Sequence, residues 1–511
     1  MVSDSGKTVS PWFTTVEMPP CPALNQDISV DVCVIGAGIA GITTAYLLSR
    51  EGKRVAVLED GQIGAGETGR TTAHLVSALD DRYYHLERLH GERGVQLAAA
   101  SHTAAINKVE EIVQAEKINC DFLRLDGYLF EPPDGDPKDL ETERDACLRA
   151  GLNVELVTRA PAPFDTGPAL KFPRQAQFHP LKYVRALAVA VQRSGGQIFT
   201  GTFAEGIEGG NPCKVTAKNG KTVTSQAIVI ATNTPVNDRV IIHSKQMAYR
   251  TYVIGVEVPR DSVAQILLWD DDMPYHYVRV MQAGGENGTT DLLIVGGEDH
   301  KTGQPEEMGA PFGRLERWTR ERYPMAGKVQ FRWSGQVMEP SDALGFIGRN
   351  PADDKNVYVI TGDSGNGMTH CTIGGILCTD LIMGRENEWA SLYDPKRKMV
   401  QPSASVQYAR ENLNVVAQFR DFLARGEVAS ADEIRNGTGA VIRKGLKLIA
   451  AYRDPQGALH ERSAVCPHLG CVVRWNHVEK SWDCPCHGSR FDPRGKVVNG
   501  PSLGDLKEAL H

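Results

Sequence analysis

Asp31-Val-Cys-Val-Ile35 runs directly into Gly36-Ala-Gly38-Ile-Ala-Gly41, which is followed by the helical pattern ITTAYLLSREG. A second apolar run, Arg54-Val-Ala-Val-Leu-Glu59, ends in an acidic residue. This order of strand, glycine-rich turn, helix, strand and acid is the fingerprint of a dinucleotide-binding βαβ unit. The glycines let the backbone approach a pyrophosphate at the helix N-terminus, and Glu59 is expected to bind a ribose hydroxyl. The alternative is a glycine-rich turn before an ordinary helix; the second strand and its acid favour the dinucleotide site.

Two more glycine-rich segments point to a large cofactor. The loop Gly64-Ala-Gly66-Glu-Thr-Gly69-Arg-Thr-Thr-Ala-His74 follows the second strand and offers little side-chain obstruction to a ligand. Much later, the strand 356–361 leads into Gly362-Asp-Ser-Gly365-Asn-Gly367-Met-Thr-His370 and a second helical run. Between these segments lies Ala227-Ile-Val-Ile-Ala-Thr-Asn-Thr234, a predicted buried strand and turn. We expect the late glycine turn to direct backbone N–H groups at another part of the same cofactor.

The region from about Asp31 to Leu392 resembles the glycine/sarcosine/D-amino-acid oxidase family of flavoproteins. The matching pieces are GAGIAG, the ETGRTTAH loop, the ATNT turn, the segment Trp333–Gly348 and the late TGDSGNGMTH. The resemblance implies an α/β Rossmann-type FAD-binding domain with an inserted antiparallel-sheet substrate domain. With the fingerprint, it implies these cofactor-binding residues: Gly36, Gly38, Gly41, Glu59, Gly69, Arg70, Thr71, Thr72, His74, Thr232, Gly362, Asp363, Gly365, Gly367, Met368 and Thr369.

The insertion explains why the FAD-type segments are separated along the chain. We expect residues 1–395 to form the FAD-dependent part. Its FAD-binding segments are predicted at about 28–85, 150–240 and 335–395, and its substrate-domain segments at about 86–149 and 241–334. There is no second GxGxxG unit with its following strand and acid, so electrons are expected to enter from an organic substrate and not from NAD(P)H.

The middle of the chain supplies candidate substrate-binding side chains. The stretches 249–258 and 275–281 alternate in the manner of half-buried strands. Aromatic and basic side chains on such strands can cover the flavin, hold a carboxylate or polarise an amine. The candidates are Tyr252, His276, Tyr277, Arg279 and His300. For any single one of them, cross-strand packing in an amphipathic sheet is the competing interpretation.

His74 has an additional hypothetical role. Some relatives attach FAD covalently through a histidine in a comparable loop, although their spacing differs by about one residue. We expect a non-covalent flavin here.

Near the end of the chain stand two boxes, Cys466-Pro-His468-Leu-Gly-Cys471 and Cys484-Pro-Cys486-His487-Gly-Ser489. Two thiolates and two imidazoles form the ligand set of a Rieske [2Fe–2S] centre, in which histidines replace cysteines on one iron. Zinc also accepts two cysteines and two histidines. Each box contains one further cysteine beyond these four ligands.

The extra cysteines resemble the cluster-capping disulfide of Rieske proteins from respiratory and photosynthetic cytochrome complexes. The resemblance covers about 432–506 and includes Gly488-Ser489 and the later Gly500-Pro501 loop. It implies a small all-β domain in which Cys466 and Cys484 bind one iron, His468 and His487 bind the other, and Cys471 pairs with Cys486. No 2-His-1-carboxylate site follows, so we expect an electron relay and not an oxygenase module.

One position departs from the high-potential relatives, which carry a tyrosine two residues after the serine. Here that position is Phe491. A hydrogen bond to a ligand sulfur stabilises the reduced cluster, so its loss lowers the reduction potential. We expect a potential below that of the respiratory proteins and above that of Rieske ferredoxins.

The overall composition supports this picture. The chain has 511 residues, 41% hydrophobic residues and a net charge of −7, which gives no reason to expect nucleic acid as a partner. No apolar run is long enough to span a bilayer and the N-terminus lacks a signal-peptide pattern, so a cytoplasmic location is expected. The polar boundary 396–425, with a predicted helix over 406–423, connects to the Rieske domain at 426–511.

These features predict an FAD-dependent dehydrogenase or oxidase of an amine or amino acid, which passes electrons through the Rieske cluster to an external acceptor. One alternative is a reductive or monooxygenase flavoenzyme that receives electrons through the cluster from an external donor. Another is a redox-sensing or electron-transfer protein without substrate chemistry.

Overall fold

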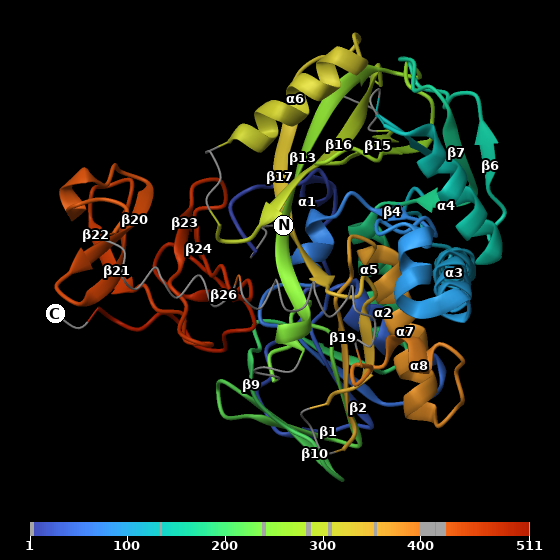
Figure 1. Cartoon of the computed structure of the whole chain (residues 1–511). Coiled ribbons are helices and arrows are strands. Elements are labelled where there is room, and N and C mark those ends of the chain that lie inside the picture. The colour runs from blue at the N-terminus through green and yellow to red at the C-terminus, as the bar shows by residue number, and fades with distance from the viewer. Residues whose placement is uncertain are drawn as a thin grey trace.

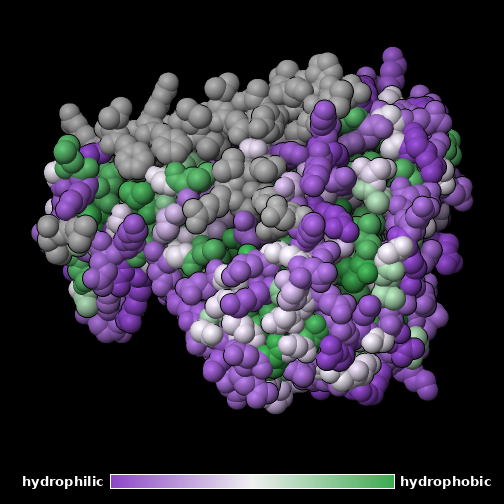
Figure 2. Space-filling view, turned by 90° about the horizontal axis from the view of Figure 1, so that it is seen from below, coloured by the Kyte–Doolittle hydropathy of each residue, from purple (hydrophilic) through white to green (hydrophobic). Residues whose placement is uncertain are grey.

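The structure is a computed structural model that describes residues 5–132, 135–237, 242–282, 288–304, 309–351, 355–398, 414 and 426–509. The statements below refer to these residues. A large body carries a smaller C-terminal lobe at its side (Figure 1). From below, Figure 2 shows a mostly hydrophilic surface, with a notch between the small lobe and the body.

A six-stranded sheet forms the centre of the α/β part. Its strand order is β18-β19-β12-β2-β3-β8, and all neighbours are parallel except β18 and β19. The inner strands are short, continuous apolar runs that are buried on both faces, as is typical of a parallel sheet. The strands are β2 (Val32–Ile35), β3 (Val55–Leu58), β8 (Gln197–Phe199), β12 (Ala227–Ile230), β18 (Phe346–Arg349) and β19 (Val357–Thr361).

Both faces of this sheet are covered. Helix α2 (Ile39–Arg50) packs against α5 (Pro180–Arg193) and α7 (Gly367–Met383). On the other side the sheet shares a hydrophobic core with a small sheet of order β1-β11-β10-β9. The strands of this small sheet are β1 (Ile28–Ser29), β9 (Ala204–Glu208), β10 (Cys213–Ala217) and β11 (Thr222–Ser225).

A nine-stranded sheet forms the second part of the body. Its path is β17-β13-β16-β15-β14-β5-β7-β4, with β6 paired to β7, and only β14 and β5 pair in parallel. The strands are β4 (His74–Leu75), β5 (Leu123–Phe130), β6 (Glu155–Val157), β7 (Ala169–Gln177), β13 (Gln246–Pro259), β14 (Leu267–Asp270), β15 (His276–Met281), β16 (Thr290–Lys301) and β17 (Val329–Pro340).

Three helices accompany the nine-stranded sheet. α6 (Ala310–Arg322) covers one face through Phe312, Leu315 and Trp318. α3 (Tyr83–Ala115) is interrupted at Gly91, where φ is +71°, and packs against α4 (Pro137–Arg149) and α7. The antiparallel substrate sheet implied by the resemblance is therefore present.

The division of the body differs from the predicted boundaries. Strand β7 lies in the segment 150–240, which was predicted to be FAD-binding, yet it pairs with β5 in the nine-stranded sheet. The short strand β4 lies within 28–85 and pairs with β7 in the same sheet. Two segments that precede β13, the one with β4 and the one with β6 and β7, therefore contribute strands to this sheet. The two parts of the body are not divided as a simple insertion would divide them. Strand β7 contains Pro173, and its buried residues do not alternate, so its sequence gave no clear strand signal.

The C-terminal lobe contains two small antiparallel sheets, as expected for the third domain. One consists of β20 (Thr438–Lys444), β21 (Lys447–Arg453) and β22 (Leu459–Ser463). The other consists of β23 (Arg474–Asn476), β24 (Ser481–Asp483), β25 (Arg490–Phe491) and β26 (Val497–Asn499). The helix predicted over 406–423 lies outside the described residues, apart from Asn414.

Short elements complete the described chain: α1 (Trp12–Thr15), η1 (Glu67–Arg70), η2 (His243–Lys245), α8 (Ala390–Tyr393) and η4 (Ala431–Glu433). The first described residues run between the lobe and the body (Figure 1). Ser5 contacts the body through Glu67 and the lobe through Arg490. None of the helices described here has the length and apolarity needed to cross a membrane.

Candidate functional site

A large cavity opens where the parallel strands end. The carboxyl ends of β2, β12 and β19 supply Ile35, Ala231 and Thr361 to its wall. The N-termini of α2 and α7 reach the same cavity through Gly38 and Gly367. Such an edge is where open α/β sheets bind ligands, and two helix N-termini favour a phosphate-bearing one. This geometry fits FAD.

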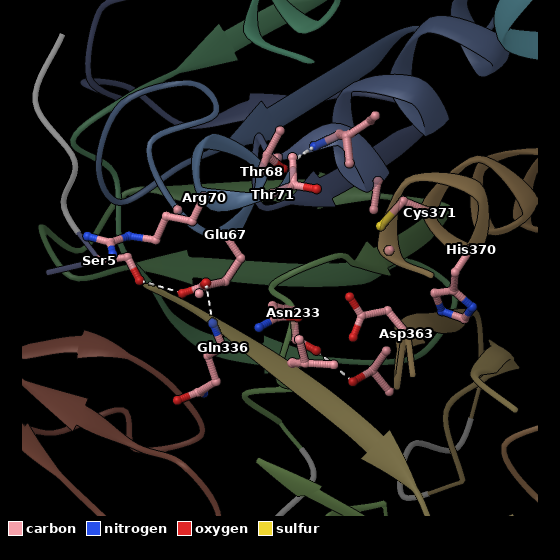
Figure 3. A pocket seen from close by; sticks show the side chains of 18 of the residues that line it. Ser5, Glu67, Thr68, Arg70, Thr71, Asn233, Gln336, Asp363, His370 and Cys371 are labelled. Carbon is pink, nitrogen blue, oxygen red and sulfur yellow. Dashed lines mark hydrogen bonds between the residues drawn. The ribbon is translucent and has the colours of Figure 1, made fainter. Parts of the chain in front are cut away.

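The residues predicted to bind the cofactor mostly line this cavity. Those in its wall are Gly36, Gly38, Glu59, Arg70, Thr71, Thr72, His74, Thr232, Gly362, Asp363, Gly365, Gly367 and Met368. Gly41, Gly69 and Thr369 are not in the wall. Figure 3 shows Thr68, Thr71, Asn233, Asp363 and Cys371 around the cavity, contributed by segments far apart in the sequence.

The glycines outside the wall have packing roles. A Cβ at Gly41 would collide with the backbone oxygen of Gly36, so this glycine lets α2 lie close to the preceding turn. A Cβ at Gly69 would collide with the ring of Phe13. Gly36 itself has a φ of +100° and lies against Ala231, a conformation and a space that favour glycine.

Glu59 has a structural task at the turn. Its Oε2 accepts a hydrogen bond from the backbone N of Ala37 at 2.6 Å, and its Oε1 accepts one from Gly61 N at 3.0 Å. Thr68 Oγ1 accepts from Ile39 N at 3.0 Å, which stabilises the first turn of α2. Both contacts hold the glycine turn in place beside the cavity.

The guanidinium of Arg70 is paired with a carboxylate of the C-terminal lobe. Its side chain has no exposed surface, and Nη1 lies 2.9 Å from Glu479 Oε1 of the C-terminal lobe. The same guanidinium donates to Ser334 O at 2.6 Å and to Thr8 Oγ1 at 3.0 Å. Arg70 also lines the cavity, so its contact with the cofactor stays a prediction, while its guanidinium joins the two lobes. No local pattern predicts this pairing because Glu479 lies 409 positions away.

Among the candidate substrate residues, Tyr277 lies in the cavity wall. Its hydroxyl is 2.8 Å from Thr251 Oγ1, and its ring packs edge-on against His74 at 5.7 Å between centroids. Tyr275, on the same face of β15, also lines the cavity. The alternation of this stretch therefore places Tyr275 and Tyr277, but not His276, at the cavity.

Three candidates lie on the opposite face of the sheet, under α6. His276 stacks on Trp318 at 4.6 Å, and its Nδ1 lies 3.0 Å from Asp270 Oδ2. Tyr252 stacks on His300 at 5.6 Å. None of the three candidates (Tyr252, His276 and His300) is in the cavity wall, so their proposed catalytic role is corrected to packing and hydrogen bonding beneath the helix.

Arg279 shares the face of Tyr277 but lies farther along β15, where it is covered. Its Nη1 donates to the carbonyls of Thr72 and Ala73, each at 2.9 Å, and its guanidinium lies over the ring of Trp12. Burial lowers its pKa to about 9. Arg279 is therefore a support for the Thr72–His74 loop and not a carboxylate-binding residue.

His74 lies in the wall of the cavity, beside Tyr277. Its Nδ1 is 3.0 Å from Thr72 Oγ1. Burial, together with the nearby charge of Arg279, lowers its pKa to about 3, so the imidazole is neutral.

Several cavity residues had no sequence signal. Asp80 and Arg82 precede α3, and Trp269 and Asp271 lie at the end of β14. Arg82 Nη2 pairs with Asp271 Oδ1 at 2.6 Å. The charged segment Asp80-Asp-Arg82 is typical of a solvent-exposed loop. The structure shows that Asp80 and Arg82 instead line a cavity.

The candidate cluster site lies on two facing loops of the lobe. The four predicted ligands are Cys466, His468, Cys484 and His487, and the two histidine rings lie 5.0 Å apart. Cys466 and Cys484 are buried, and His487 Nδ1 is buried without a hydrogen-bond partner. Two thiols beside two imidazoles, one with an unused buried nitrogen, fit a Rieske cluster.

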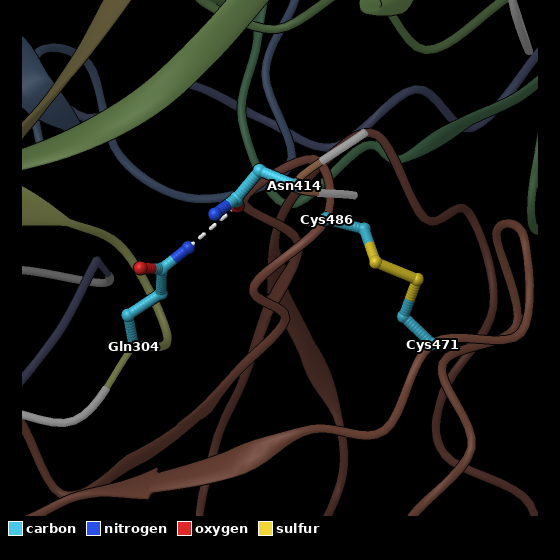
Figure 4. The surroundings of a disulfide bond; sticks show 4 residues. All are labelled: Gln304, Asn414, Cys471 and Cys486. Atoms are coloured by element: carbon cyan, nitrogen blue, oxygen red, sulfur yellow. Dashed lines mark hydrogen bonds between the residues drawn. A yellow bond between two sulfur atoms is a disulfide. The ribbon is translucent and has the colours of Figure 1, made fainter. Parts of the chain in front are cut away.

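The expected disulfide joins Cys471 and Cys486, which bridges the two loops (Figure 4). A contact with the body lies nearby, where Gln304 Nε2 donates to Asn414 Oδ1 at 2.8 Å. A Cβ at Gly303 would collide with the backbone of Cys484 and Pro485. The cluster-binding loop is thus packed directly against the end of β16.

The cluster lobe also closes the cofactor cavity. Val497, Asn499 and Gly500 of the loop at β26 lie in the cavity wall together with residues of the α/β part. His243 of η2 is buried between the two sites, with its ring centroid 5.1 Å from that of His468 and 6.1 Å from that of His487. The lobe that carries the candidate cluster site therefore also forms part of the cavity wall.

Comparison with known proteins agrees with both halves of this geometry. Residues 31–381 match the family model of the FAD-dependent oxidoreductases, and residues 424–509 match that of the Rieske [2Fe-2S] domain. The chain is 32% identical to the Rieske 2Fe-2S iron–sulfur protein YhfW of Bacillus subtilis over 502 residues, which covers 97% of this chain and 96% of that protein.

Two further relatives match the body. Gamma-glutamylputrescine oxidoreductase of Escherichia coli is 25% identical over 380 residues, which covers 71% of this chain and 86% of that protein. The crystal structure of glycine oxidase from Geobacillus kaustophilus superimposes with a TM-score of 0.61 at 19% identity, covering 72% of this chain and 99% of that one. The chain is thus a member of the FAD-dependent oxidoreductase family that binds FAD and carries a C-terminal Rieske [2Fe-2S] domain.

Proposed function

We propose that the chain is a dehydrogenase of an amine or amino acid that sends its electrons through the cluster to an external acceptor. A C–H bond next to the substrate nitrogen would lose a hydride to FAD, and the resulting imine would hydrolyse in water. FAD supplies the two-electron chemistry, and the protein binds and orients the substrate. The match to gamma-glutamylputrescine oxidoreductase supports oxidation next to nitrogen.

One observation carries the proposal: the cofactor cavity and the cluster lobe share a wall. The cavity is lined by the glycine turn at Gly36 and Gly38 and by these residues of the lobe: Val497, Val498, Asn499, Gly500, Ser502 and Leu503. Electron transfer between two centres requires that they lie close together. An oxidase that delivered electrons directly to oxygen would have no use for a cluster in a lobe that lines the cofactor cavity.

His243 offers a direct route between the sites. Its Nε2 bonds the carbonyl oxygen of Pro235 at 3.0 Å, and Pro235 follows the turn in which Thr232 and Asn233 line the cavity. Its ring packs edge-on against those of His468 and His487. A continuous path of packed atoms thus leads from the cavity wall to both histidine ligands.

Buried charges hold the lobe in this position. Glu479 pairs with Arg70 at 2.9 Å and lies 3.8 Å from Arg250 Nη1 of β13. Asp483 pairs with Arg490 at 3.2 Å, and Arg490 in turn donates to Ser5 O at 2.6 Å. Separating the lobe from the body would leave Glu479 and Arg70 without partners at a cost of several kcal/mol, whereas Asp483 and Arg490 both belong to the lobe and would stay paired. This supports transfer within a docked protein.

Anaerobic rapid mixing with a panel of amines and amino acids tests the proposal. We expect FAD to lose its oxidised absorption first and the cluster to become reduced afterwards. Replacing the ligand His487 with leucine should leave reduction of FAD intact and stop transfer to an external acceptor. Unchanged steady-state turnover in His487→Leu would contradict the proposal. Reduction of the cluster before FAD by a reduced ferredoxin would favour the opposite direction of flow.

A further inference from the structure

One part of the cavity wall is acidic. Asp80, before α3, and Asp363, after β19, both line the cavity. They lie close together across the turn at Gly365, where a Cβ would collide with the Asp80 carboxylate. Two segments far apart in the sequence thus bring two carboxyl groups to one place.

More carboxyl groups lie behind these two. Burial and the charge of Asp81 raise the pKa of Asp80 to about 7; Arg82 opposes this rise, and Asp299 and Asp363 add smaller contributions to it. Burial raises the pKa of Asp299 to about 6 and that of Glu339 well above its usual value. We call these five carboxyl groups the acidic group: Asp80, Asp81, Asp299, Glu339 and Asp363. Repulsion among them creates a need for a positively charged partner.

Asp299 shows this need directly. Its Oδ2 accepts a hydrogen bond from the hydroxyl of Tyr275 at 3.2 Å, while its Oδ1 is buried without a hydrogen-bond partner. A buried carboxylate oxygen without a donor is costly. Tyr275 itself lines the cavity, so the hydrogen bond connects Asp299 to the wall.

The arginines of the cavity wall are already paired with other carboxylates. Among the described residues that line the cavity there are two arginines, Arg70 and Arg82, and no lysine. Arg70 pairs with Glu479, and Arg82 pairs with Asp271. Arg279, the residue expected to hold a carboxylate, is covered by Trp12 and three backbone carbonyls. Two tyrosines, Tyr275 and Tyr277, complete this side, and aromatic faces also attract cations.

We infer that the substrate is a small cationic amine without a carboxylate on the reacting carbon. This inference rests on the proposed function and narrows its substrate class. The ammonium group would bind at the acidic group between Asp80 and the tyrosines. An α-carboxylate would meet the same carboxyl groups and be repelled, which provides the discrimination.

The acidic group can also accept the proton that the ammonium must lose before hydride transfer. The bound ammonium gives one proton to a carboxylate of the group, which leaves the neutral amine with its lone pair. The neighbouring C–H then loses hydride with both electrons to FAD, and the nitrogen lone pair forms the C=N bond of a protonated imine. Water hydrolyses this product outside the redox step.

The first experiment compares pairs that differ only by the α-carboxylate, at a pH above 7. Butylamine is compared with norvaline, and diaminobutane with ornithine, by the rate at which each bleaches FAD without oxygen. We expect each amine to exceed its amino-acid counterpart by at least about tenfold, the loss expected for one unfavourable charged contact. Equal or faster reduction by norvaline and ornithine would overturn the inference and leave the proposed function standing.

A binding experiment needs no turnover. Butylguanidinium and pentanoate, neither of which has an oxidisable amine, are titrated while the absorption spectrum of FAD is recorded. We expect butylguanidinium to bind and pentanoate not to bind. Tighter binding of pentanoate would overturn the inference. Binding of butylguanidinium without reduction by any amine would contradict the proposed function and support the charge preference.

A variant assigns the effect to the cavity. Asp80→Asn removes one charge from the acidic group and should weaken binding of butylguanidinium by roughly tenfold. Asp165→Asn is the control, because Asp165 lies on an exposed turn where its Oδ1 accepts from Gly167 N, a role that asparagine can keep. Equal affinity of Asp80→Asn and the wild type would overturn the inference.

Discussion

Arg70 and Glu479 form an ion pair with 2.9 Å between Nη1 and Oε1, and neither side chain has exposed surface. Arg70 belongs to the loop that lines the FAD cavity, and Glu479 precedes the second cluster box. Hydrogen bonds from Thr8 reach the same carboxylate. One buried contact thus joins the cofactor loop, the N-terminal segment and the cluster lobe.

Neutralising this pair should loosen the lobe. Glu479→Gln leaves Arg70 buried without its counter-charge and removes one of the two carboxylates near Arg250, at a cost of about 3–5 kcal/mol. Thermal unfolding followed by the absorption of FAD and of the cluster measures the effect. The matched control is Glu461→Gln, whose partner Lys444 is half exposed, and which should cost at most about 1 kcal/mol. Equal melting temperatures for the two variants would refute the role of the pair.

The same contact predicts sensitivity to acid. Burial alone would raise the pKa of Glu479, but Arg70, Arg250 and Arg490 together lower it below its usual value of 4.5. A depressed carboxyl pKa stabilises the folded state above the unfolded pKa, and that stability is lost as the pH falls below about 4.5. Unfolding measured against pH should show this loss in the wild type and a weaker dependence in Glu479→Gln. Parallel curves would argue against the ion pair.

His243 should affect transfer between the sites and not substrate oxidation. His243→Ala removes the ring between Pro235 and the two histidine ligands, so we expect slower reduction of the cluster after FAD is reduced. Stopped flow for FAD and freeze-quench EPR for the cluster separate the two steps. His460→Ala, on the outer sheet of the lobe, is the control. An unchanged rate of cluster reduction would exclude this route.

Phe491 should set the reduction potential of the cluster. Its ring is buried in β25, two positions after Ser489. By the resemblance to high-potential Rieske proteins, Phe491→Tyr adds a donor to a ligand sulfur and should raise the potential, whereas Ser489→Ala should lower it. Redox titration followed by EPR measures both shifts, with Phe491→Leu as the control. A lower potential in Phe491→Tyr would contradict this explanation.

Sequence motifs predicted those parts of the molecule that depend on local chemistry. Each of these motifs can be recognised from a short local segment: the glycine turn at Gly36, the late turn at Gly362 and the two cysteine–histidine boxes. The folds that they predict are present. The disulfide was likewise implied by a local resemblance.

The substrate side could not be predicted in this way. Which face of β13 or β15 meets the cavity depends on where α6 packs, so the alternation alone could not separate Tyr252 and His276, which lie under α6, from Tyr277. Arg279 was on the correct face but beneath Trp12, a residue from the other end of the chain. Asp80 and Asp363 of the wall, and Asp299 behind it, come from distant segments that only the fold brings together.

The central claim is that electrons from the substrate reach the cluster through FAD within one docked protein. Anaerobic mixing with a reactive amine, with FAD followed by absorption and the cluster by EPR in the same samples, tests it most directly. We expect FAD to be reduced first and the cluster signal to appear afterwards, at a rate independent of protein concentration. A cluster that stays oxidised while FAD is fully reduced, or that is reduced only as protein concentration rises, would contradict it.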